Sequence, residues 1–253
     1  MPHHVDHAAI LDRLAAGRGG VRNLFDDIDP RRLAHIVVDM QNGFMEPGAP
    51  VEVPEARSIV ANINRITRAV RAAGGTNVFL RYTSSPEGDA SWSNFMIRQG
   101  AAATGHKAAF TPGAHYWQLS PALDVAPGDQ FLDKHRFSAF TPGTCALDAL
   151  LRERGIDTVL ITGTLTNCCC ESTARDAMQL NYRVLIAADA NAALSDEEHA
   201  ATLHIMAMVF ADLYATDEVE ELLARDAPAL APVVRLSPAS WPPPPSRAAA
   251  GGP

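Results

Sequence analysis

One stretch constrains the fold of this chain more than any other: a short apolar run followed closely by three adjacent cysteines. Residues 157–161 are apolar and β-branched, which is typical of a buried strand, and residues 171–180 have the composition and spacing of a helix. The cysteines at 168–170 therefore lie at a strand-to-helix turn. Such turns lie at the carboxyl edge of a parallel sheet, where open α/β folds bind ligands and helix amides favour negative charge. A thiolate there is expected to have a lowered pKa.

Strands alternate with helices along most of the chain. The other expected strands are residues 34–39, 77–82, 130–134, 183–189 and 213–216, and the other expected helices are residues 55–73, 144–154, 196–210 and 219–223. This alternation predicts an α/β fold, a three-layer doubly wound sheet of about six mostly parallel strands with helices on both faces. Residues 83–128 are polar and rich in glycine and proline, and we expect a functional or partly helical lid there.

Composition sets the expected domain boundaries. At 253 residues, 47% of them hydrophobic, the chain can bury one sizeable core, which we place in residues 33–236. Residues 1–32 hold a short amphipathic piece and a glycine-rich break, and we expect an N-terminal arm. Residues 237–253 are rich in proline, alanine and glycine, which favours a disordered tail. An inert extension is favoured there over a ligand for a proline-binding module.

Charge and hydropathy exclude several function classes. The chain has 21 basic and 29 acidic residues and no basic run that could follow a phosphate backbone, so we expect no nucleic-acid partner. No apolar run approaches the roughly 20 residues that span a bilayer, and the start lacks the order of a signal peptide. We therefore expect a cytoplasmic protein without membrane contact. Three of the four cysteines are consecutive, a poor disulfide framework, so a reactive thiol fits better.

Three reactive side chains stand at the carboxyl ends of three separate expected strands: Asp39, Lys134 and a cysteine near 169. Because these ends share one edge of a parallel sheet, the three can converge although they are far apart in sequence. A carboxylate can take the thiol proton, an ammonium group stabilises a thiolate, and turn amides can hold an oxyanion. Each residue alone has an ordinary structural explanation, but together they predict a catalytic site.

Three motifs carry a specific resemblance to a known family. Residues 37–44 read VVDMQNGF, residues 133–140 read DKHRFSAF, and residues 166–176 read TNCCCESTARD. Over about residues 33–225 the chain resembles the isochorismatase-like cysteine hydrolases.

This resemblance implies a catalytic triad of Asp39, Lys134 and Cys169. Cys169 is the implied nucleophile because the family usually reads Thr-Asn-Val-Cys-Val, so that Cys168 and Cys170 replace valines. Of the three cysteines, we expect only Cys169 to combine exposure with a lowered pKa.

The resemblance also implies how the substrate is held. The backbone amides of Leu165 and Cys169 would form an oxyanion hole, next to a cis peptide bond between Thr164 and Leu165. The candidates to line the substrate pocket are Phe44, Trp92, Asn94 and Phe140. For each aromatic residue among them, core packing is an equally good explanation.

Departures from the family pattern narrow the expected chemistry. Nicotinamidases carry an Asp-x-His and a further His for a metal, whereas residues 81–95 contain no histidine. His106, His115 and His135 are isolated in the sequence. His199 and His204 are five residues apart, which does not place them on the same face of a helix. We therefore expect no metal and no cofactor. Isochorismatases that hydrolyse a vinyl ether often lack the cysteine, so retention of Cys169 favours attack on a carbonyl.

Within the amidases, residues 171–176 and 93–95 look closest to the ureidoacrylate and N-carbamoyl amide hydrolases. The resemblance thus implies a cysteine-nucleophile amidohydrolase that cleaves a C–N bond of a small amide, carbamoyl or ureido substrate through an acyl-thioester. The first alternative is an isochorismatase-type vinyl-ether hydrolase that uses Asp39 as acid. The second is a non-enzymatic assembly module that uses the proline-rich tail. The family generally forms dimers or tetramers, so a homo-oligomer is expected by resemblance.

Overall fold

Six parallel strands form a single sheet in the order β3-β2-β1-β4-β5-β6 in the computed structural model, which describes residues 3–225. The strands are β1 (Leu33–Val38), β2 (Thr76–Tyr82), β3 (Gln130–Lys134), β4 (Thr158–Thr164), β5 (Arg183–Ala192) and β6 (Asp212–Tyr214). The strand order runs outward in both directions from the centre, which confirms the predicted doubly wound α/β class. All five strand pairs are parallel, rather than mostly parallel.

The central strands β1 and β4 are buried along their whole length. Their sequences, LAHIVV and TVLITGT, are nearly continuous in apolar and β-branched residues, as is typical of parallel strands covered on both faces. Val38, the last residue of β1, pairs with Gly163 near the end of β4. Side chains that follow these two strands therefore lie at the same carboxyl edge.

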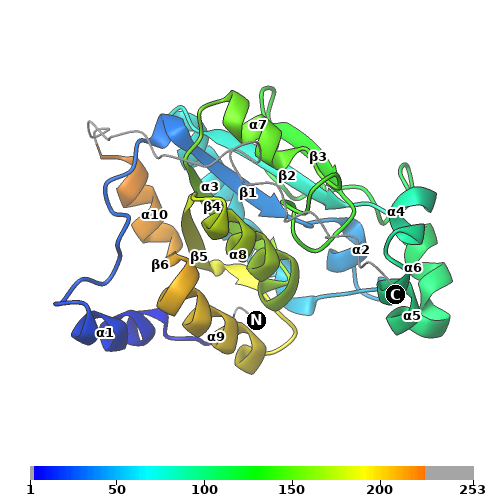
Figure 1. Ribbon diagram of the computed structural model, residues 1–253, viewed down its shortest axis with the longest axis horizontal. Helices are drawn as coiled ribbons and strands as arrows, with labels where there is room; N and C mark the ends of the chain where they lie inside the picture. The colour runs from blue at the N-terminus through cyan, green and yellow to red at the C-terminus, as the bar shows by residue number, and fades with distance from the viewer. Residues whose placement is uncertain (1–2, 226–253) are drawn as a thin grey trace, which may run out of the picture.

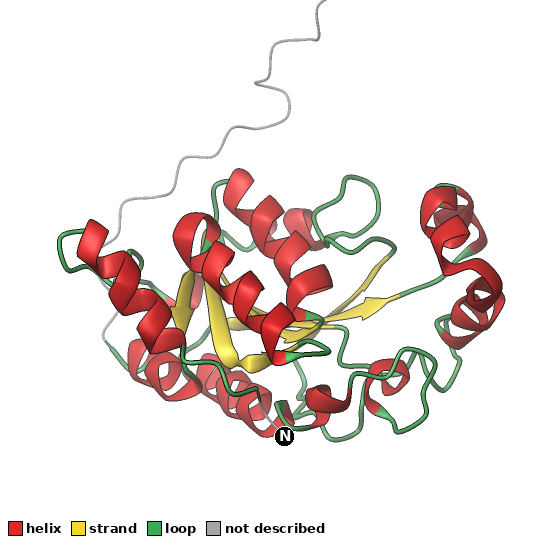
Figure 2. Ribbon diagram, turned by 90° about the horizontal axis from the view of Figure 1, so that it is seen from below, coloured by secondary structure: helices red, strands yellow, loops and turns green. Residues whose placement is uncertain are grey.

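Helices cover both faces of the sheet, as Figure 2 shows. The elements packed in one hydrophobic cluster are α1 (His7–Gly17), α7 (Leu147–Glu153), α8 (Glu171–Gln179), α9 (Asp196–Ile205) and the π-helical turn η5 (Met206–Phe210). The elements packed in the other are α2 (Asn42–Met45), η2 (Pro54–Arg57), α3 (Val60–Ala72) and α10 (Thr216–Leu223). A short 3-10 turn, η1 (Pro30–Arg32), precedes β1.

Element boundaries shift from the predicted ones where the helical geometry changes. The helix predicted over residues 55–73 is divided into η2 and α3, and the helix predicted over residues 196–210 is α9 followed by η5. Ser195 caps α9, because its hydroxyl accepts a hydrogen bond from the Glu198 amide at 3.2 Å.

Residues 83–128 hold the helices of an insertion that follows β2. They include α4 (Pro86–Ala90), α5 (Ser93–Gln99), η3 (Gly100–Ala102) and α6 (Ala103–Ala109). In Figure 1 these helices gather beyond the end toward which β1 and β2 run. The insertion therefore stands on the same side of the molecule as the carboxyl edge of the sheet.

The N-terminal segment lies against the domain rather than apart from it. Helix α1 contributes Ile10 and Leu11, both buried, to the core cluster that includes α8 and α9. The part of the predicted arm that α1 forms is therefore packed on the body of the protein. The predicted tail at residues 237–253 lies outside the described residues. Within residues 3–225, no helix has the length and apolar character that crossing a membrane requires.

Candidate active site

Asp39 leaves the sheet in an unusual backbone conformation. It follows β1 directly, has a φ of 53°, and is completely buried. Its amide donates to the Leu80 carbonyl of β2 at 3.1 Å, so the residue stays attached to the sheet. A positive φ is uncommon for a residue other than glycine and is held by the surrounding structure, often at functional sites.

The Gln41 side chain holds the Asp39 loop in place. Its amide nitrogen donates to the Tyr82 carbonyl at 3.0 Å and to the Trp117 carbonyl at 2.7 Å, while its oxygen accepts from the Tyr82 amide at 2.8 Å. Gln41 is buried. One side chain therefore ties the end of β1 to the end of β2 and to the insertion. Sequence analysis missed this role, although Gln41 lies within the motif at residues 37–44.

Lys134 is the last residue of β3 and is paired with Tyr82 in the sheet register. Its Nζ lies 2.8 Å from Asp39 Oδ2, and both side chains have no solvent exposure. Nζ also donates to the Arg136 carbonyl at 3.1 Å and lies 5.6 Å from the centre of the Tyr82 ring. Lys134 and Asp39 thus form a buried ion pair across the end of β2, as their strand-end positions predicted.

Cys169 lies in a π-helical turn, η4 (Thr166–Cys170), between β4 and α8. The peptide bond between Thr164 and Leu165 is cis, as the family resemblance implied. The Leu165 carbonyl accepts from the amides of Cys168 at 3.1 Å and Cys170 at 3.2 Å. These bonds fix the turn on both sides of Cys169, whose residue surface is 6% exposed.

The side chains of the predicted triad influence one another's protonation. Burial raises the pKa of Asp39, while the Lys134 ammonium and a hydrogen-bonding contact with Cys169 act in the opposite direction. Burial disfavours the Lys134 ammonium, but the charge of Asp39 outweighs burial and raises the pKa of Lys134. The three groups are therefore close enough to act as a unit, with a positive lysine and a carboxylate that is a stronger base than usual.

The three cysteines differ in a way that reverses a prediction from the sequence. Contact with the Cys168 thiol, together with burial, raises the pKa of Cys169 well above its usual range, and Lys134 opposes this rise. Contact with Cys169 lowers the pKa of Cys168, which is also the more exposed thiol. The prediction that Cys169 combines exposure with a lowered pKa is wrong, because the turn points that thiol into the protein. Burial and the Cys168 thiol thus favour the neutral form of Cys169.

Cys170 lies in the core. It is 1% exposed, its Sγ lies 4.0 Å from the Thr162 carbonyl oxygen, and burial raises its pKa. These features match a packing role for the residue that replaces a family valine.

Trp92 belongs to an aromatic cluster that the insertion shares with the segment after β3. Its ring stacks on Phe95 at 4.2 Å and meets Phe137 edge-on at 4.7 Å, and the Arg136 guanidinium lies 4.9 Å from its centre. Phe137 is three residues beyond Lys134, within the motif at residues 133–140. Sequence analysis missed Phe137, although its place in that motif was a signal. This cluster forms an aromatic wall between the insertion and the segment that follows Lys134.

The other candidate pocket residues occupy different surroundings. Phe44 is buried in α2, with its ring 5.0 Å from that of Phe110. Phe140 is buried with its ring 5.4 Å from Tyr182. Asn94 is exposed on α5. Core packing therefore accounts for both phenylalanines. The structure does not bring Asn94 together with the predicted triad.

Among the described residues, the predicted triad belongs neither to a metal-binding cluster nor to the groove on the insertion. Across the described residues 3–225, no three His, Cys, Asp or Glu side chains are grouped closely enough to hold a metal ion. A groove of about 920 Å³ lies along the insertion and is lined by residues that include Ser84, Asp89, Met96 and Lys107, but by none of the triad.

Comparison with known proteins supports the motifs. A model of the isochorismatase domain matches residues 33–218. A cysteine hydrolase from Pseudomonas syringae pv. phaseolicola 1448A is 30% identical, with a TM-score of 0.69 over 78% of this chain and 94% of that chain. An isochorismatase family protein from Desulfovibrio vulgaris subsp. vulgaris str. Hildenborough is 30% identical, with a TM-score of 0.67 over 77% of this chain and 100% of that chain.

A third solved structure has a named activity. It is N-carbamoylsarcosine amidase from Thermoplasma acidophilum, 28% identical, with a TM-score of 0.60 over 74% of this chain and 97% of that chain. Each likeness spans nearly all of the compared protein.

Proposed function

This chain belongs to the isochorismatase family of hydrolases, and from that premise we propose that it is a cysteine-nucleophile amidohydrolase. Its substrate class would be small amide, carbamoyl or ureido compounds, cleaved at a C–N bond. One observation carries the proposal: a fully buried Asp39–Lys134 ion pair, with the buried Cys169 thiol close enough to influence the pKa of both groups. A buried ion pair is weak support for stability, and a base beside a thiol is the arrangement that nucleophilic catalysis needs.

The first half of the reaction forms the acyl-enzyme. Asp39 takes the Cys169 proton, because the neutral resting thiol must lose it before attack, and Lys134 stabilises the thiolate. The sulfur then bonds to the carbonyl carbon, and the Leu165 and Cys169 amides stabilise the oxyanion. Collapse breaks the C–N bond, and Asp39 returns the proton to the leaving ammonia or amine.

The second half regenerates the enzyme. Asp39 takes a proton from a water molecule, whose oxygen attacks the thioester carbon. The C–S bond breaks, the acid product leaves, and Cys169 recovers its proton from Asp39. The same carboxylate therefore serves as base and acid in both halves, which its raised pKa favours.

The likeness to N-carbamoylsarcosine amidase supports a carbamoyl substrate. The aromatic wall of Trp92 and Phe137 provides a flat apolar surface for a small planar group such as an amide or a ureido group. We therefore propose Trp92 as a substrate-binding residue.

One observation favours a second function, vinyl-ether hydrolysis. Burial raises the pKa of Asp39, and a carboxyl group that holds its proton more firmly can protonate a vinyl ether without help from the thiol. The two functions differ in their need for Cys169.

The test is a panel of small amides, N-carbamoyl amino acids and ureido acids assayed for released ammonia, beside isochorismate assayed for pyruvate. We expect ammonia from at least one substrate, no ammonia with Cys169→Ala, and no pyruvate. Pyruvate release that persists in Cys169→Ala would establish the vinyl-ether function instead. Ammonia release that persists in Cys169→Ala would remove the cysteine from the mechanism.

A further inference from the structure

His199 is buried in α9, and no step of the proposed reaction uses it. It is 1% exposed, and its ring joins two segments that meet at the carboxyl edge. Nδ1 lies 2.9 Å from the hydroxyl of Thr166, which is the first residue of the turn η4, and Nε2 lies 3.1 Å from the Ala188 carbonyl of β5. No sequence pattern indicates this link, because Thr166 and His199 are far apart along the chain.

The direction of these hydrogen bonds follows from their chemistry. Burial lowers the pKa of His199 to about 4, so at neutral pH the ring carries one N–H. The Ala188 carbonyl can only accept, so the N–H must be on Nε2. Nδ1 then has a lone pair, and the Thr166 hydroxyl donates to it. Both partners are satisfied in one tautomer, which fixes the Thr166 side chain.

Thr166 lies between the two residues whose amides form the oxyanion hole. It follows Leu165 directly and starts the turn that contains Cys169. A side chain fixed at this position restrains the peptide planes on either side of it, and an oxyanion hole works only when its donors are already aimed at the developing charge. Resting on the proposed function, we propose that His199 is a positioning residue, which holds the Leu165 and Cys169 amides in place through the Thr166 hydroxyl.

The N-terminal segment closes over His199 from the other side. The His3 ring stacks on the His199 ring at 4.3 Å with an interplanar angle of 14°. His3 Nε2 accepts from the Ala193 amide at 2.9 Å, and its Nδ1 donates to Asp196 at 2.7 Å. The His3 ring therefore covers one face of the buried His199 ring.

A second link from α9 to the same region supplies a matched control. Thr202, one helical turn after His199, donates to the Glu171 carboxylate at the start of α8 at 2.9 Å. Thr202 is also buried. This hydrogen bond joins α9 to α8 and does not involve residues 165–169. Removing this bond tests for a general loosening of the helix.

The experiment compares variants that retain either the hydrogen-bond donor or the hydrogen-bond acceptor of the His199 ring. His199→Gln can still donate where Nε2 did but loses the acceptor for Thr166, whereas His199→Asn places an acceptor near the position of Nδ1. On the best amide of the substrate panel, we expect His199→Gln and Thr166→Val to lower kcat by about 10- to 100-fold with KM within about threefold. His199→Asn should recover most of kcat, and Thr202→Val should keep it.

Further combinations decide between positioning and plain stability. The double variant His199→Gln/Thr166→Val should lose no more kcat than either single variant, because both remove one hydrogen bond. If kcat instead follows the free energy of unfolding across all variants, including Thr202→Val, His199 is only structural. Unchanged kcat in His199→Gln overturns the inference alone, whereas full activity in Cys169→Ala overturns the proposed function.

Discussion

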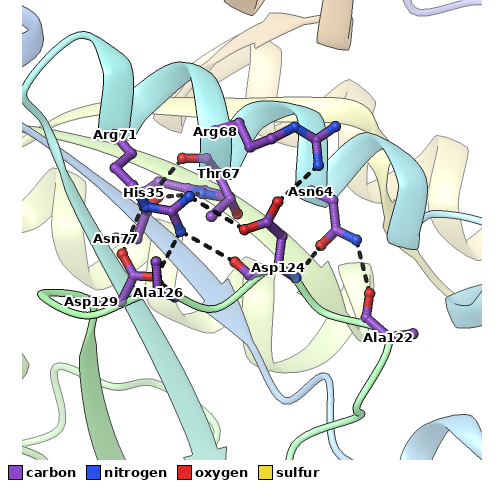
Figure 3. A network of polar contacts seen from close by, with 10 residues as sticks. All are labelled: His35, Asn64, Thr67, Arg68, Arg71, Asn77, Ala122, Asp124, Ala126 and Asp129. Carbon is purple, nitrogen blue, oxygen red and sulfur yellow. Dashed lines mark hydrogen bonds and ion pairs between the residues drawn. The ribbon is translucent and has the colours of Figure 1, made fainter.

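Two buried polar clusters lie at opposite ends of the same sheet, and they handle charge differently. At the amino end, His35 of β1 contacts Asn77 of β2 at 3.2 Å and Thr162 of β4 at 2.8 Å. Asn77 in turn donates to Asp129 at 3.2 Å, and Asp129 pairs with Arg71 at 2.8 Å. Figure 3 shows this network continuing through Arg71 to further polar side chains. The charged part therefore reaches the surface, because the Arg71 side chain is 32% exposed.

At the carboxyl end, the Asp39–Lys134 pair has no exposed member. The group buried deepest at the amino end is a histidine that burial keeps neutral, with its pKa lowered to about 4. The carboxyl end instead keeps two opposite charges in the interior, where desolvation can exceed their mutual attraction. The difference supports the proposed catalytic role of the carboxyl-end cluster, whereas the amino-end cluster has the features of a structural network.

The largest expected effect is on the thiol that completes the carboxyl-end cluster. Cys169→Ala should lower kcat by about 10⁴-fold or more, because no acyl-thioester can form. The free energy of unfolding should change little, since a small side chain is shortened. Ammonia release and urea unfolding measure the two quantities. An active Cys169→Ala with an inactive Cys168→Ala would move the nucleophile by one residue.

The second prediction removes the charge that compensates Asp39. Lys134→Met should lower kcat by about 10²- to 10³-fold and destabilise the protein by about 3–5 kcal/mol at pH 7, because it leaves an unpaired buried carboxylate. Without the ammonium, burial raises the Asp39 pKa further. Between the ordinary pKa of an unfolded aspartate and the raised pKa of folded Asp39, the folded protein binds a proton that the unfolded chain has lost. The free energy of unfolding of Lys134→Met should therefore fall as pH rises through this window.

The matched control for Lys134→Met is at the other end of the sheet. Arg71→Met also removes a cation from a buried acid, Asp129, but should keep kcat within about threefold. In a Cys168→Val background, Lys134→Met should shift the alkylation of Cys169 by iodoacetamide to higher pH, and Arg71→Met should not. An equal loss of kcat in both variants would mean that the two clusters do not differ in role.

The third prediction concerns the pH dependence of the amino-end cluster. The unfolded His35 has an ordinary pKa near 6.5, and the folded value is about 4, so between these values the unfolded chain binds the proton. The His35 contribution is fully present above pH 6.5 and is lost as pH falls through about 4, with a limit of about 3 kcal/mol. His35→Leu should flatten urea unfolding against pH in this window, with kcat at pH 7.5 unchanged. A slope equal to that of the natural protein would exclude His35 as the titrating group.

The smallest expected effects are at the two cysteines that flank the nucleophile. Cys168→Val and Cys170→Val should each change the free energy of unfolding by less than about 1.5 kcal/mol and keep kcat within about threefold, because both changes nearly conserve volume. Cys168→Val should also move iodoacetamide labelling away from this turn, since Cys168 is the more exposed thiol with the lowered pKa. Mass spectrometry of labelled peptides measures this. A label found mainly on Cys169 in the natural protein would contradict the assigned order of reactivity.

Sequence patterns alone predicted the fold class and placed the three candidate residues at one edge of the sheet. Alternating apolar runs and helical spacing are local patterns, and in a parallel sheet every strand has its carboxyl end at the same edge. Asp39 and Lys134 could therefore converge, and the structure places Lys134 Nζ 2.8 Å from Asp39 Oδ2. The motif around Cys169, together with the two other motifs, likewise indicated the family from the sequence alone.

The protonation of the site residues and the contacts that hold them in place depend on the tertiary structure. The pKa of Cys169 depends on burial and on neighbours from other strands, so the helix-start pattern predicted the wrong direction. The proposed roles of Phe137 and His199 depend on contacts between segments that are far apart in the sequence, which sequence spacing does not predict. Local sequence specifies where a strand ends, whereas burial and side-chain partners are properties of the whole packed chain.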